Sequence, residues 1–206
     1  MSPPLIRRTG LMDRKVQHRD ARLILVATED RYAGPQYFDI LQRNAVIDRS
    51  RVKVHVLATG EDNRSSPHHV LQRLDDFQVG LEPMDERWLS LDVDRWGEKG
   101  LSQVCAEATK KGYRLAVSNP CFEAWLLLHF VDRIDATTAE ACVRALRAVA
   151  GSYNKTRLQS ERYTTPTVRA ATSRARALDM NPLDRWPQAT GSHVYRLMEG
   201  LLPPEA

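Results

Sequence analysis

The sequence predicts an α/β protein in which a mostly parallel sheet is flanked by helices and the C-terminal third is helical. Over the first 118 residues, short apolar runs alternate with longer segments of helical period, which is the pattern of βα units. Beyond this point strand signals disappear. With 206 residues the chain can bury one sizeable core but is too short for two ordinary large domains. We therefore expect a flexible segment at 1–20 and a single domain at 21–206, with its sheet core at about 21–118 and a helical region at about 119–202.

Strands and helices alternate regularly through the predicted sheet core. We expect strands at 22–27, 52–59, 87–93 and 113–118, and helices at 36–47, 66–77 and 100–112. The strands are short apolar or alternating runs, of which VKVHVLAT is the clearest. The first helix follows Gly34-Pro35 and the second begins at Ser66-Pro67, because proline is accepted in the first turn of a helix. Gly112 ends the third helix, since glycine readily adopts the left-handed conformation that closes a helix.

Helices are expected throughout the C-terminal part. Their ranges are 120–131, 137–151, 167–179 and 192–202. The first, within SNPCFEAWLLLHF, is apolar nearly all round, which is typical of a buried helix. Ser118 or Asn119 before Pro120 makes a good N-cap. A helix that starts at the carboxyl end of a strand also directs a phosphate-binding N-terminus into the crevice, so Ser118 and Asn119 are candidate phosphate contacts.

Composition narrows the functional classes. The formal net charge of +4 permits a polyanionic partner without requiring one. The three cysteines, at 105, 121 and 142, form no CxxC pair and fit a reducing compartment. We recognise neither a signal peptide nor a run of about eighteen apolar residues, so we expect a cytoplasmic protein without a membrane span. Walker A, nucleophile-elbow and GxGxxG patterns are absent, which argues against a self-contained ATPase, an α/β-hydrolase and a dinucleotide oxidoreductase.

Three carboxylates stand at the ends of predicted strands. Glu29 closes the run RLILVATE, and Asp92 and Asp94 close RWLSLDVD. Because the carboxyl ends of parallel strands meet at one crevice, these side chains could converge despite their separation in sequence. Oxygen ligands without a nearby thiolate or imidazole favour Mg²⁺ or Mn²⁺ over zinc. The pattern predicts a divalent-metal site in an enzyme that acts on phosphates, with Glu29 as a third ligand or as the general acid/base.

Each of these carboxylates also has an ordinary structural interpretation. Asp92 and Asp94 could cap the next helix or face solvent in a loop. They share one face only if the strand continues through Asp94, and otherwise a turn must reorient one of them. Glu29 could be a solvated loop residue paired with Arg31. Glu123, one turn inside the apolar helix, either favours the helix dipole or adds a fourth carboxylate to the metal site.

A basic, hydroxyl-rich stretch, SYNKTRLQSERYTTPTVR, occupies 152–169. Lys155, Arg157 and Arg162 within it are candidate contacts to a nucleic-acid backbone, although an ordinary surface loop has the same composition. Trp96, beside the aspartate pair, is either a core residue or a platform for a base.

SNPCFEAWLLLHF, at 118–130, resembles the signature segment of the RloB family of bacterial defence-associated proteins. The family's Glu-Gly-x-x-Thr-Glu-Pro-x-Tyr-Phe pattern corresponds to 29–38, where the glutamate, proline, tyrosine and phenylalanine are kept. Its Asp-x-Asp corresponds to Asp92 and Asp94, and RARALD and HVYRLMEGL are similar to its closing helices. The resemblance extends over about 180 residues, from near Arg22 to the C-terminal helix.

The resemblance implies a Toprim-like catalytic core in which one glutamate and an Asp-x-Asp pair bind Mg²⁺. It implies a nuclease that cleaves phosphodiester bonds in DNA or RNA during anti-phage defence, through Glu29, Asp92 and Asp94. It also implies an ATPase of the ABC type as an activating partner.

Two departures from the family pattern lie next to the first carboxylate. Asp30 replaces the glycine that follows the glutamate, and Ala33 with Gly34 replaces Thr-Glu. An added anion beside Glu29 could alter the metal affinity or the approach of a phosphate. The alternative function is therefore a catalytically degenerate partner subunit, or a sensor of nucleotides or nucleic acid, in a defence complex.

Overall fold

The computed structural model describes residues 21–60, 64–77, 80–94 and 96–204, so the expected flexible segment 1–20 lies outside the described residues. The described chain is an α/β structure built on a four-stranded sheet in which every pairing is parallel. The strands are β1 (Arg22–Thr28), β2 (Val52–Leu57), β3 (Glu86–Ser90) and β4 (Arg114–Leu115), in the order β2-β1-β3-β4. The parallel sheet predicted from the sequence is confirmed.

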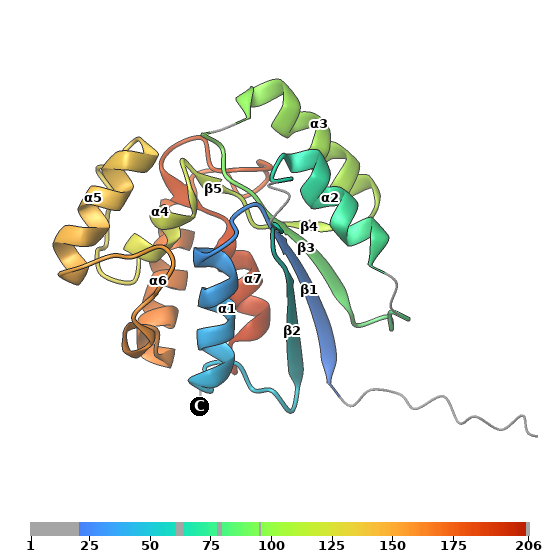
Figure 1. Cartoon of the computed structure of the whole chain (residues 1–206), viewed down its shortest axis with the longest axis horizontal. Coiled ribbons are helices and arrows are strands. Elements are labelled where there is room, and N and C mark those ends of the chain that lie inside the picture. Colours follow the sequence, from blue (N-terminus) through green and yellow to red (C-terminus); the bar gives the residue numbers. More distant parts are fainter. Residues whose placement is uncertain (1–20, 61–63, 78–79, 95, 205–206) are drawn as a thin grey trace, which may run out of the picture.

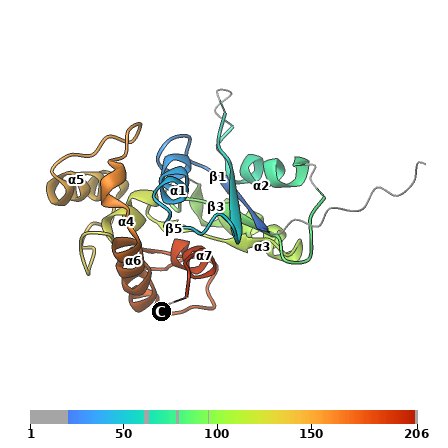
Figure 2. The same ribbon diagram turned by 90° about the horizontal axis from the view of Figure 1, so that it is seen from below.

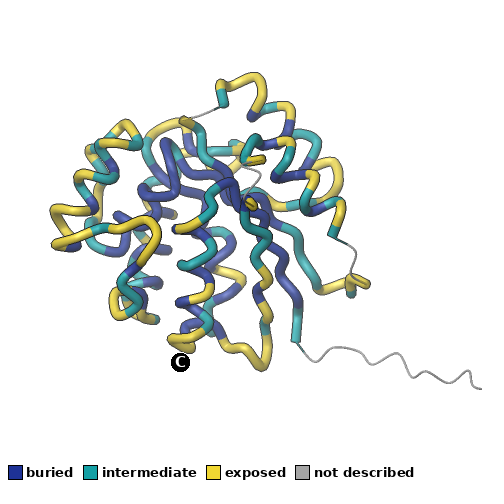
Figure 3. Tube along the Cα trace, viewed as in Figure 1, coloured by how far each residue is buried: buried dark blue, intermediate teal, exposed yellow. Residues whose placement is uncertain are grey.

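Helices cover both faces of the sheet. α2 (Pro67–Asp76) and α3 (Gly97–Lys110) lie on one face, whereas α1 (Ala33–Arg43) lies on the other together with the C-terminal helices (Figures 1 and 2). The alternation of side chains along β1 explains this arrangement, since Ile24 packs into the core cluster of α1 and Leu25 into that of α2 and α3. β1 is therefore buried on both faces, as a central parallel strand requires. Figure 3 shows this buried chain at the centre of the fold.

The C-terminal part is helical, as predicted. Its helices are α4 (Phe122–Leu127), α5 (Ala139–Ala150), α6 (Thr165–Leu178) and α7 (Val194–Leu201), with a 3₁₀ turn, η1, at Ser160–Arg162. α4 is shorter than expected, because the N–H groups of His129 and Phe130 bond three residues back in tight turns. None of the helices in the described ranges has the length and apolar character needed to cross a bilayer.

A two-stranded antiparallel pair precedes α4, although no strand was expected after residue 118. β5 (Ser118–Asn119) pairs with β6 (Gly191–Ser192). The prediction of a purely helical region is wrong at this point because two-residue strands are too short to show an alternating pattern. The N-cap prediction for Ser118 or Asn119 is also wrong. Both residues are held in β5, and Cys121 takes the N-cap position without a side-chain hydrogen bond.

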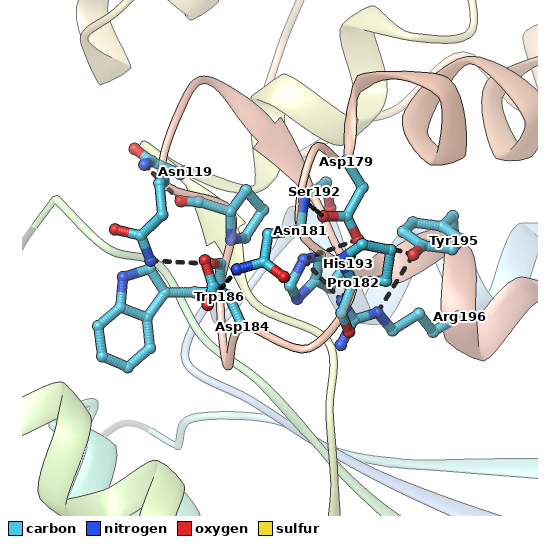
Figure 4. Close-up of polar contacts among 12 residues, drawn as sticks. Asn119, Asp179, Asn181, Pro182, Asp184, Trp186, Ser192, His193, Tyr195 and Arg196 are labelled. Atoms are coloured by element: carbon cyan, nitrogen blue, oxygen red, sulfur yellow. Dashed lines mark hydrogen bonds and ion pairs between the residues drawn. The ribbon is translucent and has the colours of Figure 1, made fainter.

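Asp179, at the end of α6, ties the C-terminal helix to the rest of the fold (Figure 4). Its Oδ2 accepts hydrogen bonds from the Tyr195 hydroxyl at 2.7 Å and from Arg196 at 3.0 Å, and lies 3.2 Å from Nε2 of His193. The backbone N–H of His193 donates to the carbonyl of Val117 at 2.8 Å. Burial, followed by the nearby charge of Arg196, lowers the pKa of His193 to about 4. The cluster therefore joins α6, α7 and the sheet around a neutral imidazole.

Two buried histidines should make the fold sensitive to acid. Burial lowers the pKa of both His129 and His193 to about 4, whereas an unfolded histidine titrates near pH 6.5. The unfolded chain therefore binds these protons first as the pH falls. Above about pH 6.5 neither histidine lowers the free energy of unfolding. Toward pH 4 this free energy falls, by on the order of 3 kcal/mol per histidine at the acid end. Urea denaturation across this pH range measures the loss.

Substitutions separate this effect from general acid denaturation. We expect His129→Gln and His193→Gln each to flatten the decrease in stability between neutral and acid pH, even though each also lowers the stability at neutral pH. His68→Gln, at an exposed position on α2, is the control and should keep the wild-type pH dependence. A wild-type pH dependence in both buried-site variants would contradict the assignment.

Candidate active site

The pairing of β1 with β3 brings two candidate carboxylates to the same edge of the sheet. Thr28 pairs with Ser90 at the last position of both strands, and the N–H of Glu29 then donates to the carbonyl of Ser90 at 3.0 Å. β3 is prolonged past its formal end by a bridge between Asp92 and Ser118. Glu29 and Asp92 thus leave neighbouring strands at the carboxyl edge, where parallel sheets build their sites.

Glu29 is buried, with 3% of its surface exposed, and its carboxylate is held from two sides. Oε2 accepts a hydrogen bond from the backbone N–H of Asp92 at 3.1 Å. Oε1 accepts one from the indole N–H of Trp96 at 2.7 Å. The interpretation of Glu29 as a solvated loop residue is therefore wrong, and its side chain has a defined orientation.

The chain turns between the two aspartates. The N–H groups of Val93 and Asp94 both donate to the carbonyl of Pro120, at 3.0 Å and 3.1 Å, so the extended run ends before Asp94. Of the two arrangements considered for this pair, the turn is the one that occurs. Asp92 is partly buried beside Glu29, and Asp94 is exposed at the rim.

Glu123, in the first turn of α4, is a further buried carboxylate at this edge. Its Oε1 accepts a hydrogen bond from the Tyr153 hydroxyl at 2.8 Å and lies 3.6 Å from the ammonium of Lys155. Lys155 also pairs with Oδ1 of Asp30 at 3.1 Å. The other oxygen of Asp30 accepts the N–H of Gly34 at 2.8 Å. Lys155 thus connects the loop after β1 with the start of α4.

Lys155 is carried by residues 151–163, which we call the strap. The strap leaves α5, crosses to the first turn of α1 and then turns into α6 (Figure 1). Gln36 of α1 holds it, because its Nε2 donates to the carbonyl of Lys155 at 3.0 Å and its Oε1 accepts the N–H of Leu158 at 3.1 Å. Asn44, after the end of α1, donates to the carbonyls of Ser160 and Tyr163. α1 and the residue after it therefore hold the strap between Lys155 and Tyr163.

Asp92 is the electrostatic centre of the site. Burial raises its pKa well above the usual aspartate range, and the charges of Glu29, Glu123 and Asp94 raise it further. Lys155 acts in the opposite direction. Burial works to lower the pKa of Lys155 itself, but Glu123, Asp30 and Asp92 raise it overall. The four carboxylates predicted as metal ligands thus share one electrostatic environment, and this environment favours a cation.

The donor atoms suit a hard divalent cation. Glu29, Asp92, Asp94 and Glu123 offer only carboxylate oxygens, which Mg²⁺ and Mn²⁺ prefer. Within the described ranges, no three acidic, histidine or cysteine side chains stand close enough to form a ready-made metal centre. Mutual repulsion of like charges keeps carboxylates apart, and a divalent cation would remove that repulsion. The residues therefore fit the ion in chemical type, and the metal site stays a prediction.

The predicted phosphate contacts fall into two groups. Ser118 is buried, with its hydroxyl 2.8 Å from that of Ser192. The side-chain amide of Asn119, labelled in Figure 4, donates to the carbonyl of Pro187 at 2.8 Å. Their engagement within the fold argues against direct phosphate contacts. Lys155, in contrast, lies at the carboxylates, and Arg157 is exposed on the strap.

Two contacts of the site were not recognised in the sequence. The indole of Trp96 binds Glu29, whereas we considered it only as a core residue or a base platform. Tyr153 binds Glu123 and drew no attention, although it stands two residues before Lys155. That spacing would have directed both side chains to one face of an extended segment, but nothing in the sequence marks the strap as extended.

A model of the RloB-like protein family matches residues 24–201. The chain belongs to this family. The resemblance inferred from SNPCFEAWLLLHF is thereby confirmed. No curated protein and no solved structure gives a significant match. The range matched by the RloB-like family contains the candidate carboxylates and the strap, so both are part of the region that defines the family.

Gln36 offers a direct test of how the strap is held. We expect Gln36→Ala to accelerate amide hydrogen exchange across 153–158, because two hydrogen bonds to the strap are lost, each with a net contribution of about 1 kcal/mol. Exchange measured by mass spectrometry gives the protection of this segment. Gln72→Ala, at an exposed position on α2, is the matched control. Wild-type protection at 153–158 in the Gln36 variant would show that the strap is held elsewhere.

Proposed function

We propose that this RloB-like protein is a Mg²⁺-dependent nuclease with a Toprim-type site, which cleaves phosphodiester bonds in DNA or RNA as part of anti-phage defence. The observation that supports this most is the gathering of carboxylates and one lysine around Asp92. Burial raises the pKa of Asp92, the charges of Glu29, Glu123 and Asp94 raise it further, and Lys155 lowers it. A site of this charge pattern, at the carboxyl edge of a parallel sheet, suits a metal ion and a phosphate group.

The residues that would hold the ion are Glu29, Asp92 and Asp94, with Glu123 as a fourth ligand. When bound, Mg²⁺ stabilises the negative charge that develops on a phosphate during cleavage. The chain prepares two of these ligands in advance. The N–H groups of Asp92 and Trp96 orient Glu29, and the Tyr153 hydroxyl orients Glu123. Such outer contacts typically change metal affinity or activity by about 10–100-fold when removed.

Lys155 supplies a positive charge for the substrate phosphate. About 45% of its side chain is exposed, so the ammonium is reachable from solvent although it touches buried carboxylates. Its pairing with Asp30 and Glu123 holds the long side chain in place before the substrate arrives. A phosphate oxygen can then accept from the same ammonium without a large loss of side-chain freedom.

The departures from the family pattern are compatible with activity. Asp30, which replaces a glycine, already has two partners, the N–H of Gly34 and the ammonium of Lys155. Its charge is therefore compensated within the fold and is not left to repel a phosphate.

A second candidate function uses the same site without catalysis. Lys155 pairs with Asp30 and Glu123, so the chain itself supplies a positive charge at the site that could hold a phosphate. In this case the protein would be a sensor of nucleotides or nucleic acid, or a partner subunit in a defence complex. An ABC-type ATPase, implied by the family resemblance, is the expected partner in either function, so assays should include it.

Cleavage is the first test. Purified protein with Mg²⁺ or Mn²⁺ should cut at least one of a panel of single- and double-stranded DNA and RNA, alone or with the ATPase. Asp94→Asn should reduce the rate by at least about 100-fold, because it removes a proposed ligand of the ion that stabilises the developing negative charge, and the loss of one such stabilising group has effects of this scale. Glu98→Gln, at an exposed position in the first turn of α3, is the matched control. Equal behaviour of wild type and Asp94→Asn on every substrate would rule the nuclease out.

Metal binding separates the two functions without any assay of cleavage. Titration calorimetry should detect Mn²⁺ binding by the wild type, and Asp92→Asn should weaken it at least about tenfold. The same substitution should raise the free energy of unfolding in EDTA at neutral pH, because an aspartate with a raised pKa destabilises the folded state once it ionises. A wild type that binds no Mn²⁺ would favour the sensor.

A further inference from the structure

The strap also encloses a cavity of about 430 Å³, which no step of the proposed cleavage uses. The cavity lies between the strap, the end of α5 and Phe130, the last residue of the turn after α4. Its volume falls within the range of small-molecule sites. The strap therefore contributes to two candidate sites, the carboxylate cluster and this cavity.

Apolar surface forms one part of the cavity lining. Leu146 and Ala150 come from α5, and Leu158 from the strap, and all three are buried. The Tyr163 ring, 3% exposed, lines the cavity as well. Because each of these side chains is about nine-tenths buried or more, they close the floor of the cavity and offer little apolar surface to a ligand.

The polar part of the lining is rich in hydrogen-bond donors. Asn154 uses its carbonyl oxygen to accept from the N–H and hydroxyl of Thr156, which leaves its amide N–H groups for another partner. Arg157 is exposed, and its guanidinium has no ion-pair or hydrogen-bond partner within the part of the chain described. Arg162 and Glu161 add one charge of each sign to the lining. The net positive lining favours a ligand that carries acceptor oxygens.

Tyr153 connects the cavity with the carboxylates. Its side chain lines the cavity, and its hydroxyl donates to Oε1 of Glu123 at 2.8 Å. Lys155 lies two residues further along the strap and pairs with the same carboxylate at 3.6 Å. A ligand in the cavity is therefore one side chain away from the group that is expected to hold the metal.

We propose that this cavity binds one nucleotide of a nucleic-acid strand, with the phosphate at Arg157 and acceptor atoms of the base at the side-chain amide of Asn154. Its role as a subsite for the strand rests on the proposed function, whereas nucleotide binding itself does not. The volume of the cavity, the donor groups of Arg157 and Asn154, and the shared Tyr153 are the three observations that carry the proposal.

Binding without metal is the first experiment. Adenosine, guanosine, cytidine and uridine 5′-monophosphates and inorganic phosphate are titrated in EDTA and followed by calorimetry. We expect at least one nucleotide to bind at least tenfold more tightly than phosphate, and Arg157→Gln to weaken it about tenfold. Arg144→Gln, at an exposed position on α5 outside the cavity, is the matched control. No nucleotide binding, or equal affinity for phosphate and nucleotides, would overturn the proposal.

A second arm uses a short oligonucleotide with the preferred base. Arg157→Gln should weaken binding of the strand in EDTA and, with Mg²⁺, should raise KM about tenfold while kcat stays within about twofold. If the variant loses mononucleotide binding but keeps full affinity for the strand, the cavity serves free nucleotides and the subsite is refuted. If the wild type binds the strand through Arg157 but cleaves nothing, the subsite proposal is supported and the proposed nuclease function is refuted.

Discussion

Parallel pairing of β1 with β3 is the constraint on which the site depends. The pairing places Glu29 beside Ser90 through a backbone hydrogen bond, before any side chain makes a contact. The carboxylate of Glu29 then accepts the N–H of Asp92, so the strand ends and the acidic groups are locked together. A shift of one residue in this register would turn Glu29 to the opposite face of the sheet. The core that holds the register is therefore also what holds the candidate active site.

Burying like charges at one edge requires compensation, and the strap provides it. Lys155 reaches Asp30 and Glu123 from a segment that follows α5, far along the chain from the sheet. α1 holds the strap through Gln36, and α1 is itself packed on β1. The helical C-terminal part is therefore more than a cover for the sheet. It supplies the cation, the tyrosine that contacts Glu123 and a cavity next to both.

The strands and the candidate carboxylates could be predicted from the sequence, whereas several contacts between distant residues could not. The strands were recognised because apolar runs such as RLILVAT occupy central positions, and the carboxylates because they end those runs. The prediction of an N-cap at Ser118 or Asn119 was wrong because both residues pair in β5, whose partner strand lies about seventy residues further along the chain. Asp30 was noticed only as a departure from the family pattern. Its compensation by Lys155 could not be anticipated, since the two residues are joined by folding alone.

The sequence by itself determined the α/β class, the order of the sheet's strands and helices along the chain, the family and the set of candidate carboxylates. These features follow from local periodicity, from residues at strand ends and from one distinctive segment. Tertiary structure alone decided which groups surround Asp92, that Trp96 and Tyr153 orient two of the carboxylates, and that the strap carries Lys155 to them. These contacts join segments widely separated along the chain, and no local pattern encodes the packing that brings them together.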